Sequence, residues 1–552
     1  MTRLVLLNIT FLLTFCACKS EIANKNTGEI AKGGKSYGGV FKLSIPSKPS
    51  RLFPYSSNSY YEQQLSSQLF ETLFTTDSAQ KSAGNLAERY ELLDHGMTFR
   101  IYLRKNIRFH GSGVALNSKD VLFSLAFLCS ASKENSYSYL LIDKIKGAKT
   151  FYDNSKTNNI DLKNFSGAKI IDDFIIDVYL TFPYSQFPQL LSHPNLVILS
   201  YENFQNNNDG FFKNPVGTGA FRLEKITEEK IRIVRNDAYW KCDEHGNQLP
   251  FLDAVEAYYS VNERDWFQEE KIDMIQNISS EKLNSLFGNL NDAMNGKNQP
   301  HRFYQIKNKN LNFLVYNLSL PPFNNQRNRE QINAAINARA LCENVLAGDG
   351  EPTQNAFVPL SFFNSLNNSL EKPIYEKRKA GSDFKKGEKI NLFVNKNTSE
   401  LGMRWVEALI LQIEENTSLV VNLVKGSEED FNKMWKAGEI HIAKYGWVAD
   451  YPDPDSYLSI FYSKASLAKQ IAFNSEFYDR LYLETFRSVN QNERLSKQQT
   501  CDRFLIQNTL VTPLFLQDFV FVVNINMRDF RVNTEGQLDF SSVYYKKVPK
   551  LN

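Results

Sequence analysis

Apolar and polar residues alternate along residues 97–104, so that one face is apolar and the other carries Arg and Tyr. A period of two is typical of a strand with one buried face. Asn117, followed three residues later by Asp120, predicts the N-cap and first turn of a helix. Residues 221–235 alternate again. The first half of the chain is therefore predicted to contain short strands with interspersed helices, an α+β pattern.

The pattern changes in residues 390–447, where segments with the period of a strand alternate with segments with the period of a helix. The predicted elements are a strand at 390–394, a helix with apolar residues at 406, 409, 410 and 413, a strand at 419–424, a helix capped by Ser427, and a strand at 440–445. Alternation of this kind predicts a parallel α/β sheet. Residues 446–450 leave the carboxyl end of the last strand, where ligands bind in open α/β sheets. Asp450 is thus a candidate binding residue, and the alternative is a surface-turn aspartate before a Pro-containing bend.

Length and charge narrow the class of protein. The chain has 552 residues, and because single cores stop growing near ~250–300 residues, two or three domains are expected. The net charge of +3 favours neither nucleic acid nor an anionic membrane surface as a partner. Aromatic residues reach 13%, which fits either a Phe-rich core or a lined binding cleft.

The N-terminus predicts export. After Arg3, residues 4–15 are largely apolar, but a transmembrane helix needs ~20 such residues, and the pattern is typical of a secretory signal. The following Cys-Ala-Cys resembles the lipobox of bacterial lipoproteins. We expect a signal peptide at 1–17, lipidation of Cys18 and a flexible tether at 18–36. Cys16 as the lipidated residue and an ordinary cleaved signal are the alternatives. The body is expected outside the cytoplasm, lipid-anchored in the cell envelope, with the choice of membrane open.

Signatures of catalysis are missing. Residues 33–36 resemble the end of a phosphate-binding loop, but its first Gly would stand where Glu29 lies. The sequence has no G-x-S-x-G elbow and no zinc-ligand spacing of His. We therefore expect no enzyme, no metal site and no cofactor. Four cysteines of the body form no CxxC pair, so disulfides and buried free thiols both stay open: Cys129, Cys242, Cys342 and Cys501.

Several blocks, in order along the chain, carry a resemblance to a known family. The blocks are NLAERY at 85–90, GMTF at 96–99 with LRKNIRFH at 103–110, PVGTGAF at 215–221, RNDAYW at 235–240 with LPFLD at 249–253, PPF at 321–323 with INAAI at 332–336, and GWVADYPDP at 446–454. The chain resembles the extracellular solute-binding proteins that serve peptide and nickel ABC importers.

The resemblance implies a mixed α/β and α+β fold of the large three-domain, two-lobed periplasmic-binding-protein type (cluster C), with lobes joined by β crossovers. It implies a discontinuous core domain at 37–75, 210–300 and 515–552, an inserted domain at 76–209, and a second α/β lobe at 301–514.

The resemblance also implies a site. In the peptide binders of the family, the residue matching Asp450 holds the α-ammonium group of the ligand. Trp447 would form a wall of the cleft or pack in the core. Lys444 stands where some oligopeptide binders carry a basic residue for the ligand carboxylate. The backbones of Tyr445 and Gly446 could pair with an extended peptide as an added strand.

The expected function is that of a monomeric, non-enzymatic binding component that captures di- or oligopeptides in an interlobe cleft. It would deliver them to the permease of an ABC importer, with the lipid as its membrane contact and no nucleic acid partner. The chain departs from the family pattern at 52–54, 109–114 and 336–338. Another solute (a nickel chelate, haem or a sugar) and an envelope sensor or scaffold therefore remain alternatives, with a hydrolase last.

Overall fold

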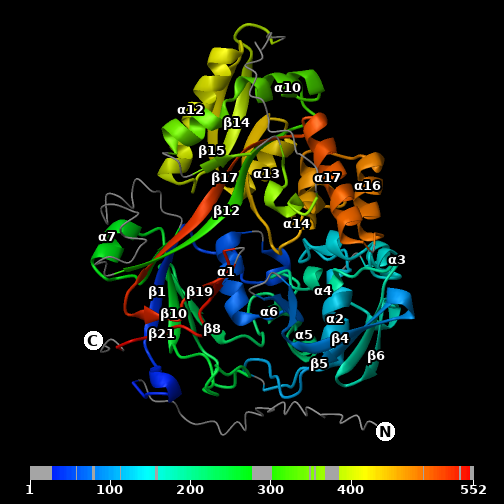
Figure 1. Ribbon diagram of the computed structural model, residues 1–552, viewed down its shortest axis with the longest axis vertical. Coiled ribbons are helices and arrows are strands. Elements are labelled where there is room, and N and C mark those ends of the chain that lie inside the picture. Colours follow the sequence, from blue (N-terminus) through cyan, green and yellow to red (C-terminus); the bar gives the residue numbers. More distant parts are fainter. Residues whose placement is uncertain are drawn as a thin grey trace, which may run out of the picture.

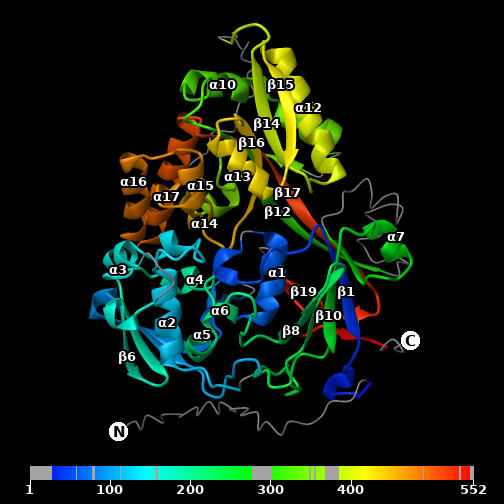
Figure 2. The same ribbon diagram turned by 180° about the vertical axis from the view of Figure 1, so that it is seen from behind.

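The computed structural model of the chain has two lobes, one above the other along its longest axis (Figure 1). It describes residues 28–57, 59–77, 81–111, 113–155, 160–276, 301–346, 350–353, 356–366, 384–488, 490–533 and 536–547. The lower lobe contains both the first and the last described residues, and the upper lobe is built from the later-middle part of the chain (Figures 1 and 2). No helix in these ranges is long and apolar enough to cross a membrane.

One 11-stranded sheet runs through both lobes. Its strands are β1 (Val40–Ile45), β8 (Phe221–Ile226), β9 (Lys230–Arg235), β10 (Ala254–Tyr259), β11 (Met274–Gln276), β12 (His301–Tyr316), β13 (Gly350–Pro352), β14 (Lys389–Asn395), β15 (Val420–Gly426), β16 (Ile442–Val448) and β17 (Val511–Asn524). The order is β15-β14-β16-β12-β17-β11-β1-β10-β9-β8, with β13 beside β17.

The strands β12 and β17 connect the lobes. They are the longest of the described strands, with 16 and 14 residues, and they pair antiparallel over most of their length. The lower half of β17 also pairs with β11, and the upper half of β12 pairs with β16. The register of the pair shifts between Ile306 and Asn310, where a β-bulge increases local twist. The predicted two-lobed fold with β crossovers is thus confirmed.

The upper lobe has the predicted parallel arrangement, because β14 pairs in parallel with both β15 and β16. Its helices are α10 (Gln326–Ala335), α11 (Ala338–Ala340), α12 (Glu400–Asn416), α13 (Glu428–Lys436), α14 (Asp455–Leu458), α15 (Ser466–Gln470), α16 (Glu476–Phe486) and α17 (Gln491–Gln507). The predicted apolar stripe of α12 is buried at Val406, Leu409 and Ile413. Ser427 caps α13 through a reciprocal capping box with Asp430.

The lower lobe carries a second sheet, of four strands in the order β4-β5-β7-β6. The remaining elements are α1 (Tyr60–Leu69), β2 (Phe74–Thr76), β3 (Ser82–Gly84), β4 (Ala87–Leu93), β5 (Thr98–Leu103), α2 (Ser118–Leu128), α3 (Ala148–Asn154), β6 (Ala168–Asp172), β7 (Ile175–Tyr179), α4 (Phe187–Leu190), α5 (Tyr201–Asn206), α6 (Asn208–Phe211), α7 (Glu263–Gln268), β18 (Met527–Arg528), β19 (Arg531–Val532), β20 (Leu538–Asp539) and β21 (Tyr544–Tyr545). Asn117 and Asp120 form the predicted cap of α2.

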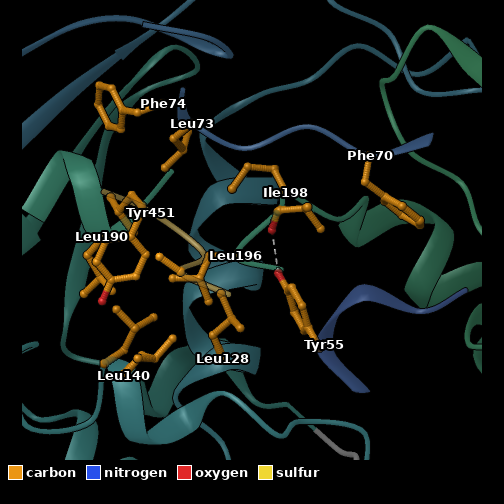
Figure 3. Packing of buried hydrophobic residues seen from close by; sticks show 14 of the residues in the cluster. Tyr55, Phe70, Leu73, Phe74, Leu128, Leu140, Leu190, Leu196, Ile198 and Tyr451 are labelled. Atoms are coloured by element: carbon orange, nitrogen blue, oxygen red, sulfur yellow. Dashed lines mark hydrogen bonds between the residues drawn. The ribbon is translucent and has the colours of Figure 1, made fainter. Parts of the chain in front are cut away.

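Aromatic side chains fill much of the core. Phe53, Phe127 and Phe211 are buried and pack with rings at edge-to-face angles, a geometry that adds to simple area burial. Tyr55 is fully buried and donates a hydrogen bond from its hydroxyl to the carbonyl of Val197 at 2.7 Å (Figure 3). The excess of phenylalanine in the composition is therefore accounted for largely by the core.

Two expectations of the sequence concern the N-terminus and the cysteines. Cys18 lies outside the described residues. The described end of the predicted tether, residues 28–36, contacts the body, because Lys35 forms ion pairs with Asp243, Glu244 and Asp529 at 2.8–3.2 Å. The thiols of Cys129, Cys342 and Cys501 are free and buried, which excludes a disulfide between any two of the four body cysteines.

The turn in the PVGTG block depends on the absence of a side chain at Gly217. A Cβ atom there would lie 2.1 Å from the carbonyl oxygen of Leu69 at the end of α1. We expect Gly217→Ala to lower the free energy of unfolding by about 1–3 kcal/mol through overpacking, measured by denaturant unfolding. Gly446→Ala is the control for stability, since its Cβ would meet the nearest atom at an ordinary 3.4 Å. Equal stability of the two variants would contradict this interpretation.

Candidate functional site

A cavity of about 640 Å³ lies between the lobes. It falls within the ~300–1,000 Å³ typical of small-molecule sites. All five residues that the sequence analysis singled out contribute to its wall: Lys444, Tyr445, Gly446, Trp447 and Asp450. The opposite wall comes from α1 and from residues 136–139. Asn310 of β12, Phe519 of β17 and residues of β14, of α13 and of the segment 460–470 also line the cavity.

The strand β16 supplies one wall and has a free edge. Along β12 it is paired from Ile442 to Val448, but it pairs with β14 only at Ile442 and Ala443. From Lys444 onward, no described strand lies on that second edge. Backbone N–H and C=O groups on this edge are free of ladder partners and lie at the cavity wall. Such an edge can accept an extended peptide as a further strand.

Tyr445 and Trp447 lie two residues apart on β16, so their side chains point to the same face of the strand. Tyr445 packs against Phe313 and Phe431, and its hydroxyl donates to Gln470 Oε1 at 2.8 Å. Trp447 is half-buried, and its indole N–H donates to the carbonyl of Ser456 at 2.9 Å. Both rings are therefore held in place while they form part of the cavity wall.

Lys444 has a different environment. Its Nζ lies 5.3 Å from the ring centroid of Trp405 on α12, and it makes no ion pair with any described residue. Burial lowers the pKa of Lys444 to about 8. The ammonium group thus rests on an aromatic ring rather than beside Asp450, and its contact with a ligand carboxylate stays a prediction.

Asp450 follows β16 and is fixed by contacts from three segments. Its Oδ1 accepts a hydrogen bond from Gln63 Nε2 at 3.0 Å, and its Oδ2 lies 3.2 Å from His193 Nε2. The backbone N–H of Asp450 donates to Ser456 Oγ at 2.8 Å. Only 17% of the side chain is exposed. The carboxylate is therefore oriented in the cavity wall before any ligand contacts it.

The protonation pattern leaves Asp450 negatively charged. The backbone N–H of Asn195 donates to His193 Nδ1 at 3.0 Å, so the ring proton lies on Nε2 and is donated to Asp450. Burial raises the pKa of Asp450, but the electrostatic and hydrogen-bond contacts of His193 and the hydrogen bond of Gln63 outweigh it, and the pKa lies below its usual value. The site presents an anion at neutral pH.

Gln63 and His193 were missed by the sequence analysis. Gln63 lies on α1, for which the sequence analysis predicted no element, and His193 lies in a turn before a proline. Their separation from Asp450, 387 residues for Gln63, leaves no local spacing to detect. The lower-lobe side of the cavity, with its tyrosines, was not predicted either.

Further contacts hold the lobes together beside the cavity. Asp143 in the lower lobe accepts a hydrogen bond from the Tyr462 hydroxyl at 2.6 Å and pairs with Lys464 Nζ at 2.7 Å. Gln189 of α4 donates to the carbonyl of Pro452 at 3.0 Å. In both views α3 and α4 lie beneath α14 and α16 (Figures 1 and 2). Tyr451 also extends from the upper lobe to Leu190 in the buried cluster (Figure 3).

Comparison with known proteins is consistent with this architecture. The profile described as "Bacterial extracellular solute-binding proteins, family 5 Middle" matches residues 81–469. The chain is 24% identical to heme-binding protein A of Haemophilus influenzae, over 87% of this chain and 88% of the relative. It is also 24% identical to the periplasmic oligopeptide-binding protein OppA of Escherichia coli, over 85% of each chain.

A solved structure shares the fold. The periplasmic binding protein DppA from Helicobacter pylori, in complex with the peptide STSA, aligns with a TM-score of 0.77 at 20% identity. The alignment covers 93% of this chain and 99% of that one.

The contacts of Asp143 predict how strongly the closed arrangement is held. In Asp143→Ala, Lys464 and Tyr462 lose a charged partner worth about 1.5–3 kcal/mol per hydrogen bond, so the population of open molecules should rise about tenfold or more. Small-angle X-ray scattering should then show a larger radius of gyration. Asp153→Ala is the control, because among the described residues Asp153 forms an ion pair only with Lys149, and both side chains are exposed on α3. Superimposable scattering curves for the wild type and Asp143→Ala would rule out a closing role for these contacts.

Proposed function

We propose, since the chain belongs to family 5 of the bacterial extracellular solute-binding proteins, that it captures di- or oligopeptides between its lobes and delivers them to the permease of an ABC importer. The observation that carries the proposal is the buried, oriented anion of Asp450 in the cavity wall. A buried carboxylate is costly unless a cation pairs with it. The α-ammonium group of a peptide supplies that cation.

The free edge of β16 supports the same ligand class. An extended peptide that adds to this edge would form hydrogen bonds with the backbones of Tyr445 and Gly446, whatever its side chains. Trp447 would limit the space beside it. Lys444 remains the candidate for the ligand carboxylate. To reach that carboxylate, the ammonium group of Lys444 would leave its contact with the ring of Trp405.

The domain limits of the sequence analysis belong to this proposal. The core at 37–75, 210–300 and 515–552 and the insertion at 76–209 would form the lower lobe, and 301–514 would form the upper lobe. Ligand binding would then shift the hinge equilibrium towards closure. The monomeric state and the absence of a nucleic acid partner stay predictions.

The curated relatives include a haem-binding protein as well as oligopeptide-binding proteins. Native mass spectrometry of the purified protein distinguishes the two ligands. A bound mass in the peptide range supports the proposal, and a mass equal to haem contradicts it.

The role of Asp450 can be measured by calorimetry with short peptides. We expect Asp450→Asn to weaken binding about 10- to 100-fold, because the charge-assisted contact with the α-ammonium contributes about 1.5–3 kcal/mol. Wild-type protein should lose a similar factor for an N-acetylated peptide, and the variant should not discriminate between the two peptides.

Glu429→Gln is the control, since it removes a carboxylate of α13 outside the cavity lining. Unchanged peptide affinity in Asp450→Asn would show that this residue does not hold the ligand amine. A wild type that binds neither peptide would contradict the proposed function itself.

We also propose that Cys18 carries the lipid anchor after removal of residues 1–17. In bacteria that express the chain, Cys18→Ala should move it from the membrane fraction to the soluble fraction, and the lipid mass should be lost from its N-terminal peptide. Cys16→Ala should remain in the membrane. If Cys16→Ala is instead released into the soluble fraction, the lipidated residue is Cys16 and not Cys18.

A further inference from the structure

Glu428 adds a second acidic side chain to the cavity. It is the first residue of α13, is exposed, and contributes to the cavity wall near Tyr445 and Phe431. Within the described part of the chain it forms no hydrogen bond and no ion pair. It is therefore a charge that faces the ligand space without a protein partner.

The neighbouring polar groups are engaged with one another. The hydroxyl of Tyr445 donates to Gln470 Oε1 at 2.8 Å, and Gln470 Nε2 donates to Asn432 Oδ1 at 2.7 Å. The indole of Trp435 donates to the carbonyl of Gln470 at 2.6 Å. This network fixes the wall one turn along α13 but does not extend to Glu428.

The charges around Glu428 are mostly negative. Asp450 lies in the same cavity wall, and Glu62 on α1 lies behind the opposite wall, where it accepts hydrogen bonds from Ser50 N at 2.7 Å and Ser57 Oγ at 3.1 Å. The one cation of the described lining, Lys444, rests on Trp405. Although Glu428 is exposed, desolvation by the surrounding cavity wall, followed by repulsion from Glu62, raises its pKa. A cation beside Glu428 would relieve that repulsion.

The position of Glu428 in a helix gives a competing explanation. Acidic residues in the first turn stabilise a helix through its dipole, and Glu428, Glu429 and Asp430 all occupy the first turn of α13. Asp430 completes the capping box, and Glu429 is exposed outside the cavity lining. Because Glu429 shares the dipole effect but does not face the ligand space, it separates the two explanations.

We propose, building on the peptide-binding function above, that Glu428 is a specificity-determining residue that favours peptides with a lysine or arginine side chain. Asp450 would pair with the α-ammonium group, and Glu428 would pair with a basic side chain further along the same peptide. Backbone pairing along β16 would then set a broad affinity, and Glu428 would superimpose a preference of charge.

The test uses tetra-alanine and two series derived from it, with lysine or glutamate at position 2, 3 or 4. Calorimetry on the wild type should show at least one lysine peptide that binds about tenfold more tightly than tetra-alanine, with the matching glutamate peptide weaker than tetra-alanine. The preference should decrease between 0.05 and 0.5 M salt, at roughly the concentrations that screen such charges.

The variants assign the preference to one side chain. Glu428→Gln should lose the preference for lysine peptides over tetra-alanine, and Glu428→Lys should reverse it towards glutamate. Glu429→Gln should keep the wild-type preference. Thermal unfolding of the variants confirms that α13 remains folded.

Three results would overturn the inference. A lysine preference that persists in Glu428→Gln assigns it to another group. Equal binding of all peptides by the wild type removes the preference while leaving the proposed function intact. A wild type that binds none of the peptides contradicts both proposals.

Discussion

The antiparallel pairing of β12 with β17 is the constraint on which the rest of the molecule depends. The two strands run through both lobes and join the strands of the two lobes into one continuous sheet. Because β16 pairs with β12 along its whole length, the pair also fixes where β16 ends. The cavity wall, the free edge and Asp450 all follow from that end point. The register shift between Ile306 and Asn310 lies between the lobe-specific halves of the pair, where a change in twist would alter the angle of the lobes.

Asp450 illustrates how a site can be shared between lobes. The upper lobe supplies the carboxylate and the lower lobe supplies its two hydrogen-bond donors, Gln63 and His193. Both donors orient the oxygens, and with the proton of His193 on Nε2 neither removes the negative charge. The carboxylate of Asp450 therefore has both of its side-chain hydrogen-bond donors only when the lobes meet. This links recognition of a cationic group to closure of the lobes.

Local signals predicted much of the fold. The stripe of Val406, Leu409 and Ile413 and the cap at Ser427 lie within single elements, where side-chain spacing and capping chemistry act directly. The position of Asp450 after a parallel strand followed from topology. Gln63 and His193 could not be found in this way, since their approach to Asp450 depends on packing between separate lobes. Lys444 shows a further limit: its chain position was informative, but the alternation of β16 turns its side chain towards Trp405.

The lower lobe is assembled from segments that lie far apart in the sequence, and this affects how the chain folds. Its sheet pairs β1 with β10 and β11, and β11 in turn pairs with β17. Tyr545, a few residues from the C-terminus, donates its hydroxyl to the carbonyl of Val40 and to Asp273. The contacts of β1 near the N-terminus thus depend on residues that are synthesised last, such as Tyr545. Contacts of such long sequence separation form slowly. The upper lobe can complete its β14-β15-β16 unit from neighbouring segments, so we expect that unit to form before the strands of the lower-lobe sheet have all paired.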